Sequence, residues 1–247
     1  MEFESEFEHK GHKVYKNTFL QKAYMRIVYD KGDWGRESFL DNLRPFAKEH
    51  FNVDVVDYNK DKDMKFIAPG IETEFLFSYD YAKVNIGRKG YKSFDETMKG
   101  HVSTIQSFVG TVLKEDAIKE MVIGKVNAWK IEIKDRNPDI SIPINFIFKE
   151  KYADRIKRDG EDVIKGTVKI KSPMKTEGAN LFLEFGFDYS ECPKLALTLN
   201  LQVRYFPQDR IKTGDMLNIA EEINNVVYDA YFGIVTDNVL KVMDEEV

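Results

Sequence analysis

The stretch SFDETMKGHVSTIQSFVGTVL, residues 93–113, carries the clearest helix signal in the chain. Ser93 and Glu96 form the S-x-x-E pattern of a capping box, and Asp95 adds negative charge to the first turn. Apolar residues then recur at the spacing that places them on one helix face: Phe94, Met98, Val102, Ile105, Val109 and Val112. The pattern predicts an amphipathic helix that packs this face on a sheet.

The residues on both sides of this helix alternate in polarity, as half-buried strands do. After the helix, residues 121–134 place Trp129, Ile131 and Ile133 on one face and charged side chains on the other. Before it, residues 19–29 alternate in the same way, with Lys22, Tyr24 and Arg26 on one face. Further strands are predicted at residues 53–58, 64–68, 72–79, 81–87, 163–171, 180–189 and 195–206.

These elements predict an α+β protein with mainly antiparallel sheets, in which two strand-then-long-helix lobes pack together. The expected lobes span residues 17–135 and 139–247, with an acidic tail at residues 1–16. A helix at 38–50 contains Pro45, which predicts a kink or an early break. The second long helix is expected over residues 215–243, and residues 140–158 are ambiguous. No repeat is visible residue by residue, so a duplicated architecture is only an interpretation of the element order.

The acidic tail has two interpretations. Glutamates at positions 2, 4, 6 and 8 alternate with Phe3, Ser5 and Phe7. Either the phenylalanines dock an extended peptide on the rest of the chain, or the segment is a solvated terminus.

Composition limits the compartment and the class of protein. The 247 residues are 43% hydrophobic and 32% charged, with a net charge of −5. Cys192 stands alone, so no internal disulfide forms, and no run of about 18 apolar residues predicts a membrane span. We therefore expect a cytoplasmic protein. Its acidity disfavours a main role in coating nucleic acid, although a local basic patch remains compatible with nucleic-acid binding.

No motif in the sequence predicts catalysis, a metal site or a cofactor. The four histidines do not converge, and neither a phosphate-binding loop nor a G-x-S-x-G elbow is present. The weak alternative is Glu132-Ile133-Lys134, because metal-dependent nucleases place a carboxylate and a lysine two positions apart on one strand face. Alternating charge on a solvent-facing strand produces the same tripeptide.

A basic segment is the main candidate binding surface. Lys165, Thr167, Lys169 and Lys171 alternate along one face of a predicted strand. This face is suited to an acidic protein segment, including the chain's own tail, or to nucleic-acid phosphates. Alternatively, the lysines keep an edge strand soluble.

The order of segments resembles a sporadically distributed bacterial family of proteins of similar length and uncharacterised function. The resemblance rests on residues 15–20 before the strand at 23–28, residues 84–85 and 90–94 at the helix start, and residues 201–206, 230–232 and 235–237 near the end. The family's Arg-Tyr-x-Asn signature is missing from residues 122–129. The resemblance implies an α+β fold and no catalytic residues.

Taken together, the sequence favours a protein–protein interaction or sensor module without catalysis, which binds a protein partner or itself. Nucleic-acid binding, and the nuclease that would use Glu132 and Lys134, are the alternatives. A homo-oligomer is expected because antiparallel sheets leave edges that must be paired, covered or charged.

Overall fold

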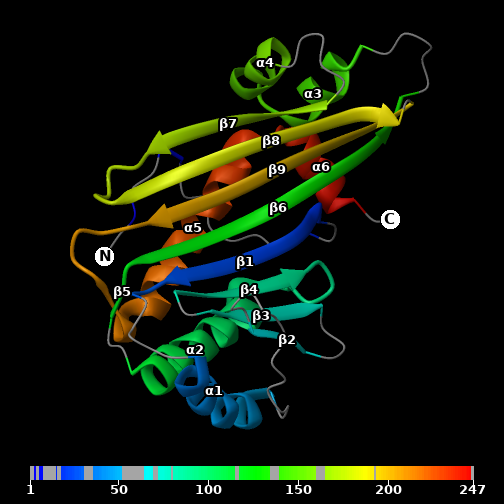
Figure 1. The fold of residues 1–247 in the computed structure, drawn as a ribbon. Helices are drawn as coiled ribbons and strands as arrows, with labels where there is room; N and C mark the ends of the chain where they lie inside the picture. Colours follow the sequence, from blue (N-terminus) through cyan, green and yellow to red (C-terminus); the bar gives the residue numbers. More distant parts are fainter. Residues whose placement is uncertain are drawn as a thin grey trace.

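Two central strands, β1 (Leu20–Val28) and β6 (Glu120–Glu132), pair antiparallel and join both halves of the chain in one sheet. The computed structural model describes residues 3, 6–7, 15, 18–30, 36–51, 64–68, 72–78, 80–114, 117–133, 139–159, 165–191 and 193–245. Within these residues the sheet has eight strands in the order β2-β3-β4-β1-β6-β9-β8-β7, all antiparallel to their neighbours. Figure 1 shows the helices on one side of it. The predicted α+β class with mainly antiparallel pairing is confirmed.

The first half supplies four strands. Its elements are β1, α1 (Arg36–Phe51), β2 (Met64–Ala68), β3 (Thr73–Phe77), β4 (Tyr81–Gly87) and α2 (Lys99–Phe108). The helix predicted from residue 93 is confirmed, with π-helical turns at Phe94–Met98 and Val109–Leu113 on either side of α2. Ser93 Oγ accepts a hydrogen bond from the Glu96 amide at 3.0 Å, as the capping pattern predicts.

The second half repeats this element order. It contains β6, α3 (Ser141–Ile147), α4 (Glu150–Asp159), β7 (Lys165–Pro173), β8 (Ala179–Glu191), β9 (Lys194–Tyr205), α5 (Met216–Ile234) and α6 (Asp237–Asp244). From the centre outward the strand order is β1-β4-β3-β2 on one side and β6-β9-β8-β7 on the other. Each half is therefore a strand, one or two helices, three strands and a long helix, arranged about the β1–β6 pair. The short strands β5 (Ala117–Ile118) and β10 (Ile211–Lys212) form a separate ladder.

The prediction of a single long helix at residues 215–243 is wrong in one respect, because the helix is interrupted between α5 and α6. Val235 and Thr236 have extended backbone conformations. Val235 forms an isolated antiparallel bridge with Phe148, and the Thr236 amide donates to the Ile147 carbonyl at 2.9 Å. The break thus allows residues 235 and 236 to pair through the backbone with the end of α3. Helical periodicity in the sequence does not reveal this tertiary contact.

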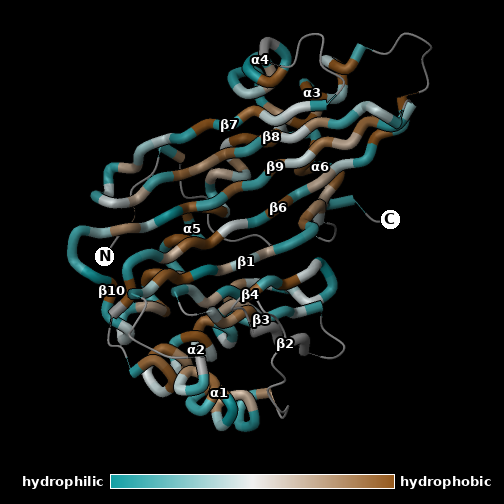
Figure 2. Tube along the Cα trace, viewed as in Figure 1, coloured by the Kyte–Doolittle hydropathy of each residue, from teal (hydrophilic) through white to brown (hydrophobic). Residues whose placement is uncertain are grey.

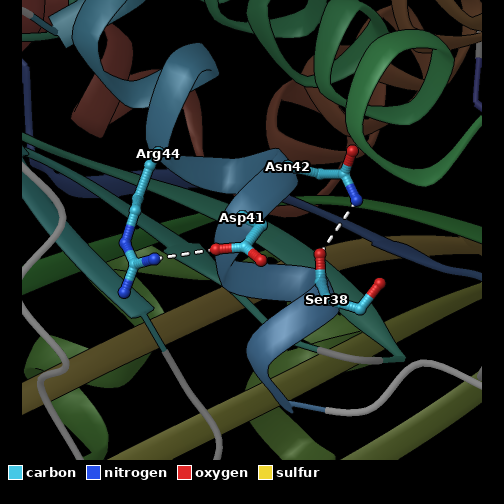
Figure 3. Close-up of polar contacts among 4 residues, drawn as sticks. All are labelled: Ser38, Asp41, Asn42 and Arg44. Carbon is cyan, nitrogen blue, oxygen red and sulfur yellow. Dashed lines mark hydrogen bonds and ion pairs between the residues drawn. The ribbon is translucent and has the colours of Figure 1, made fainter.

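Helix α1 continues through Pro45 to Phe51, so the early break considered for this position does not occur. Two polar contacts span the turn before the proline (Figure 3). Arg44 pairs with Asp41 at 2.8 Å, and the Asn42 side chain donates to the Ser38 carbonyl at 2.8 Å. The ambiguous residues 140–158 form α3 and α4, whereas the strand predicted at 53–58 lies outside the described residues.

Hydropathy alternates along the strands (Figure 2), and buried apolar side chains alternate with more exposed ones in the same strands. All six residues predicted for the apolar face of residues 93–113 are buried, as are Ile223, Val227 and Ala230 of α5. Leu217, predicted for the same face, is partly buried and packs against the core. Burial of these helix faces is the main source of their stability, because isolated helices of this length are marginal in water.

Phe3 and Phe7 dock on the rest of the chain, as the first of the two interpretations of the tail expects. Phe3 is 6% exposed, and its ring meets Tyr205 edge-on with a centroid separation of 4.8 Å. A Cβ at Gly233 would collide with the Phe7 ring, so the glycine in α5 makes room for this contact. Glu6 forms an ion pair with Lys151 at 3.5 Å.

Truncation of the central helix face tests this architecture. Ile105 is fully buried, so Ile105→Ala is expected to lower the free energy of unfolding by about 2–5 kcal/mol in urea denaturation. Lys99→Ala is the control, because Lys99 is exposed and forms only a 4.0 Å pair with Asp95; its effect should stay within about 0.5 kcal/mol. Equal stability of wild type and Ile105→Ala would contradict the packing of α2 on the sheet.

Candidate anion-binding site on the open face of the sheet

Within the described residues, one face of the sheet has no helix on it (Figure 1). Basic side chains from three of its middle strands project on that face. We call this side the open face. Lys22 and Arg26 from β1, Lys83 from β4 and Arg204 from β9 project there, and we refer to these four residues as the open-face cation cluster. They line a hollow of about 350 Å³ together with Tyr24, Val122, Val126, Asn200 and Gln202.

Tyr24 occupies the middle of the hollow. It lies opposite Gly124 in the β1–β6 register, and its hydroxyl is 3.1 Å from both Asn200 Oδ1 and Gln202 Oε1 on β9. The phenol therefore reaches across β6, which is possible because Gly124 has no side chain. Burial raises the pKa of Tyr24 to about 12, more than its hydrogen bond to Asn200 lowers it. At neutral pH the group is thus a protonated donor and is unsuited to act as a base.

Two cations of the cluster stand directly opposite each other. Arg26 and Lys83 are register partners on neighbouring strands, and like charges in such positions destabilise a sheet. Burial, followed by the charges of Lys22 and Arg26, lowers the pKa of Lys83, while Glu74 opposes the shift. Arg26 Nε is buried without a hydrogen-bond partner in the described part of the chain. The opposed pair therefore lowers the stability of the protein when no ligand is bound.

Aromatic rings and amides surround these cations. The ammonium groups of Lys22 and Lys83 lie 5.9 and 5.5 Å from the centroid of the Tyr24 ring. The Arg26 guanidinium lies 5.5 Å from the Tyr81 ring, and that of Arg204 lies 5.6 Å from the Phe182 ring. Such contacts hold the charges in place without neutralising them.

Carboxylates neutralise only part of the cluster. Arg204 contacts Glu120 Oε1 through Nε at 2.7 Å and through Nη2 at 2.6 Å, and Glu120 is itself buried. Within the described residues, Lys22, Arg26 and Lys83 form no ion pair. Three positive charges at one hollow therefore have no ion-pair partner in the described residues, and Glu74 acts on one of them, Lys83, only through its electrostatic field.

The lysines predicted from the sequence lie elsewhere on the open face. Lys165, Lys169 and Lys171 are exposed on β7, the last strand of the sheet. Lys165 is 2.6 Å from Asp188, Lys169 is 3.8 Å from Glu184, and Lys171 lies over the Phe182 ring at 5.7 Å. Hydrogen bonds from Lys165 and Ser190 lower the pKa of Asp188 to about 2. This arrangement fits the alternative of an edge strand kept soluble by lysines.

The residues of the nuclease alternative are only partly described. Glu132 is exposed at the end of β6, opposite Lys194, in a second hollow that also contains Asp188 and Glu191. Lys134 lies outside the described residues. Across the described ranges, no three His, Cys, Asp or Glu side chains form a group suited to hold a metal ion.

An apolar groove lies between the end of β6 and helices α3 and α6. Three of the four large apolar side chains that are exposed in the described residues line it: Ile142 (65% exposed), Phe146 and Val242. Exposed apolar patches of this kind commonly mark interaction sites. The protein partner and the self-association expected from the sequence stay predictions.

Comparison of the chain with models of known protein families and with curated protein sequences finds no match. Among the described residues, no helix combines the length and apolarity required to cross a membrane. Interpretation of the open face therefore depends on its own geometry.

Sequence reasoning missed the open-face cation cluster because its members come from three strands. The sequence signal for the cluster was the alternation that placed Lys22, Tyr24 and Arg26 on one face of the first strand. The register that brings Lys83 and Arg204 to the same hollow depends on strand order, which alternation does not specify.

The Tyr24–Gly124 contact can be tested with a pair of glycine substitutions. A Cβ at residue 124 would collide with the Tyr24 phenol, so Gly124→Ala is expected to lower the free energy of unfolding by about 1–3 kcal/mol. Gly100→Ala is the matched control, because open space surrounds this position in α2 and alanine favours a helix by up to about 1 kcal/mol. If urea denaturation showed Gly124→Ala to be as stable as wild type, the ring would not lie over Gly124.

Proposed function

We propose that the protein is a non-catalytic binding module that recognises a phosphate-bearing ligand, either a nucleic-acid strand or a free nucleotide, on the open face of its sheet. The observation that carries this proposal is the opposed pair of Arg26 and Lys83, beside Lys22 and without a carboxylate partner in the described residues. A phosphate bound between these groups would convert their repulsion into charge-assisted hydrogen bonds.

The chemistry around the pair supports the same class of ligand. Arg26 Nε is a buried donor without a partner, and guanidinium groups bind phosphate with several parallel hydrogen bonds. Asn85 Oδ1, which is also buried and unpartnered, and the amides of Asn200 and Gln202 add polar groups suited to a base or a sugar. The net charge of −5 does not oppose this function, since the basic residues are concentrated at one hollow.

Catalysis is not part of the proposal. Tyr24 remains a neutral phenol at physiological pH because its pKa is raised to about 12. The carboxylate of Glu120 is already bound to Arg204, and that of Glu74, which acts on Lys83, accepts a hydrogen bond from the Asn85 side chain at 3.2 Å. The site thus has the groups needed to hold an anion, and its tyrosine is not a base at neutral pH.

Binding of a fluorescein-labelled single-stranded oligonucleotide, followed by fluorescence anisotropy, tests the proposal. With about three phosphates neutralised, affinity should fall roughly twentyfold between about 50 and 200 mM salt. Lys83→Met should weaken binding about tenfold, because one charge-assisted hydrogen bond contributes roughly 1.5–3 kcal/mol. The free Lys83→Met protein should be no less stable than wild type, since the substitution removes a like-charge contact.

Lys165→Met is the matched control, because Lys165 lies on the same face but is paired with Asp188; binding should be nearly unchanged. Competition with ADP and with inorganic pyrophosphate distinguishes the two candidate ligands. If ADP displaces the oligonucleotide effectively, the ligand is a free nucleotide. If displacement is weak, the ligand is a nucleic-acid strand. No binding of the oligonucleotide or of ADP at low salt would contradict the proposal. Equal losses in Lys83→Met and Lys165→Met would also contradict it, because they would indicate a diffuse electrostatic surface.

A further inference from the structure

The helix-covered face of β6 contains two polar residues in an otherwise apolar row. Met121, Ile123 and Trp129 point into the core as the strand pattern requires, but Lys125 and Asn127 point the same way. Asn127 is buried. Polar groups in this layer are costly unless they have partners, so the pattern indicates a local function.

Helix α5 places a third polar side chain next to these two. Asn224 is 2% exposed, and its Oδ1 atom has no hydrogen-bond partner in the described part of the chain. Leaving such an amide oxygen unbonded costs about 1–3 kcal/mol. The side chain lines a pocket of about 200 Å³ between the sheet and α5, together with Lys125 and Asn127. This space is far larger than the roughly 10–15 Å³ that one water molecule requires.

Aromatic rings form much of the remaining lining, together with aliphatic side chains, Lys92 and the hydroxyl residues Thr18 and Ser93. The Lys125 ammonium lies 5.4 Å from the Tyr91 ring and 5.8 Å from the Tyr228 ring, and it forms no ion pair within the described residues. Tyr15 stacks on Phe232 with a centroid separation of 5.5 Å. The pocket therefore combines the Lys125 ammonium, one unbonded amide oxygen and aromatic rings, which are features of small-molecule sites. Lys92 also lines it, but its ammonium pairs with Glu96 at 3.7 Å.

We propose that this sheet–helix pocket binds a small organic carboxylic acid that also carries an N–H or O–H donor. The carboxylate would accept hydrogen bonds from Lys125, the donor would satisfy Asn224 Oδ1, and the apolar body would contact the tyrosine rings. The pocket is on the opposite side of the sheet from the open-face cation cluster, so this inference does not depend on the proposed function.

Calorimetric titration with three probes tests this inference. 4-Hydroxybenzoate and the aliphatic 6-hydroxyhexanoate carry both groups, whereas 4-hydroxybenzamide lacks the charge. We expect saturable binding of at least one acid and a weaker interaction with the amide. Lys125→Met should weaken binding of the acid about tenfold or more. Lys130→Met is the control, because Lys130 lies on the same strand but is exposed on the open face, and it should bind as wild type does.

Asn224→Leu distinguishes a ligand-binding role from a structural one. If the amide serves a ligand, the variant should keep or raise the melting temperature of the free protein and lose binding of the acid. The inference would be overturned by the absence of saturable binding of both acids, by equal affinity in wild type and Lys125→Met, or by a destabilised Asn224→Leu that still binds normally. If Lys125→Met disrupts the fold, the binding and melting temperature of Asn224→Leu decide whether the pocket binds the acid.

Discussion

The antiparallel pairing of β1 with β6 is the interaction on which the rest of this structure depends. It joins two halves with the same element order into one sheet, and its register brings Tyr24 opposite Gly124. Because side chains alternate along a strand, this register also fixes which residues share a face. A slip by one residue would move Lys22 and Arg26 into the core and Met25 to the surface. The hydrophobic effect therefore determines the position of the cations as well as the core.

The same alternation explains why the two sides of the sheet differ in chemistry. The helix-covered side buries mainly aliphatic and aromatic residues, and three of the polar residues there, Lys125, Asn127 and Asn224, surround one pocket. The open face carries cations on strands of both halves, and only Arg204 of the four in the cluster has a carboxylate partner in the described residues. Each of these two groups costs stability in the free protein. Proteins keep destabilising polar groups mainly where a ligand offsets the loss of stability. We therefore interpret both the pocket and the open-face cation cluster as binding sites.

Much of the fold could be predicted from the sequence because local patterns were strong. The capping box at Ser93 and the apolar spacing to Val112 identified the central helix, and alternation identified β4 at the residues where it occurs. The break between α5 and α6 could not be predicted, since it depends on the bridge between Val235 and Phe148, which are far apart in the chain. The site was missed for a related reason. Lys83 and Arg204 reach the same hollow only through strand order. The lysines of β7 are conspicuous in the sequence, yet two of the three, Lys165 and Lys169, are paired with carboxylates.

The most direct measurement of the central claim is an NMR titration of the isotope-labelled protein with inorganic pyrophosphate, the smallest ligand that carries the shared phosphate chemistry. We expect the amide signals of residues 22–26, 83–85 and 202–204 to shift together and saturate, while those of β7 stay in place. No saturable shift, or shifts confined to the lysines of β7, would contradict it.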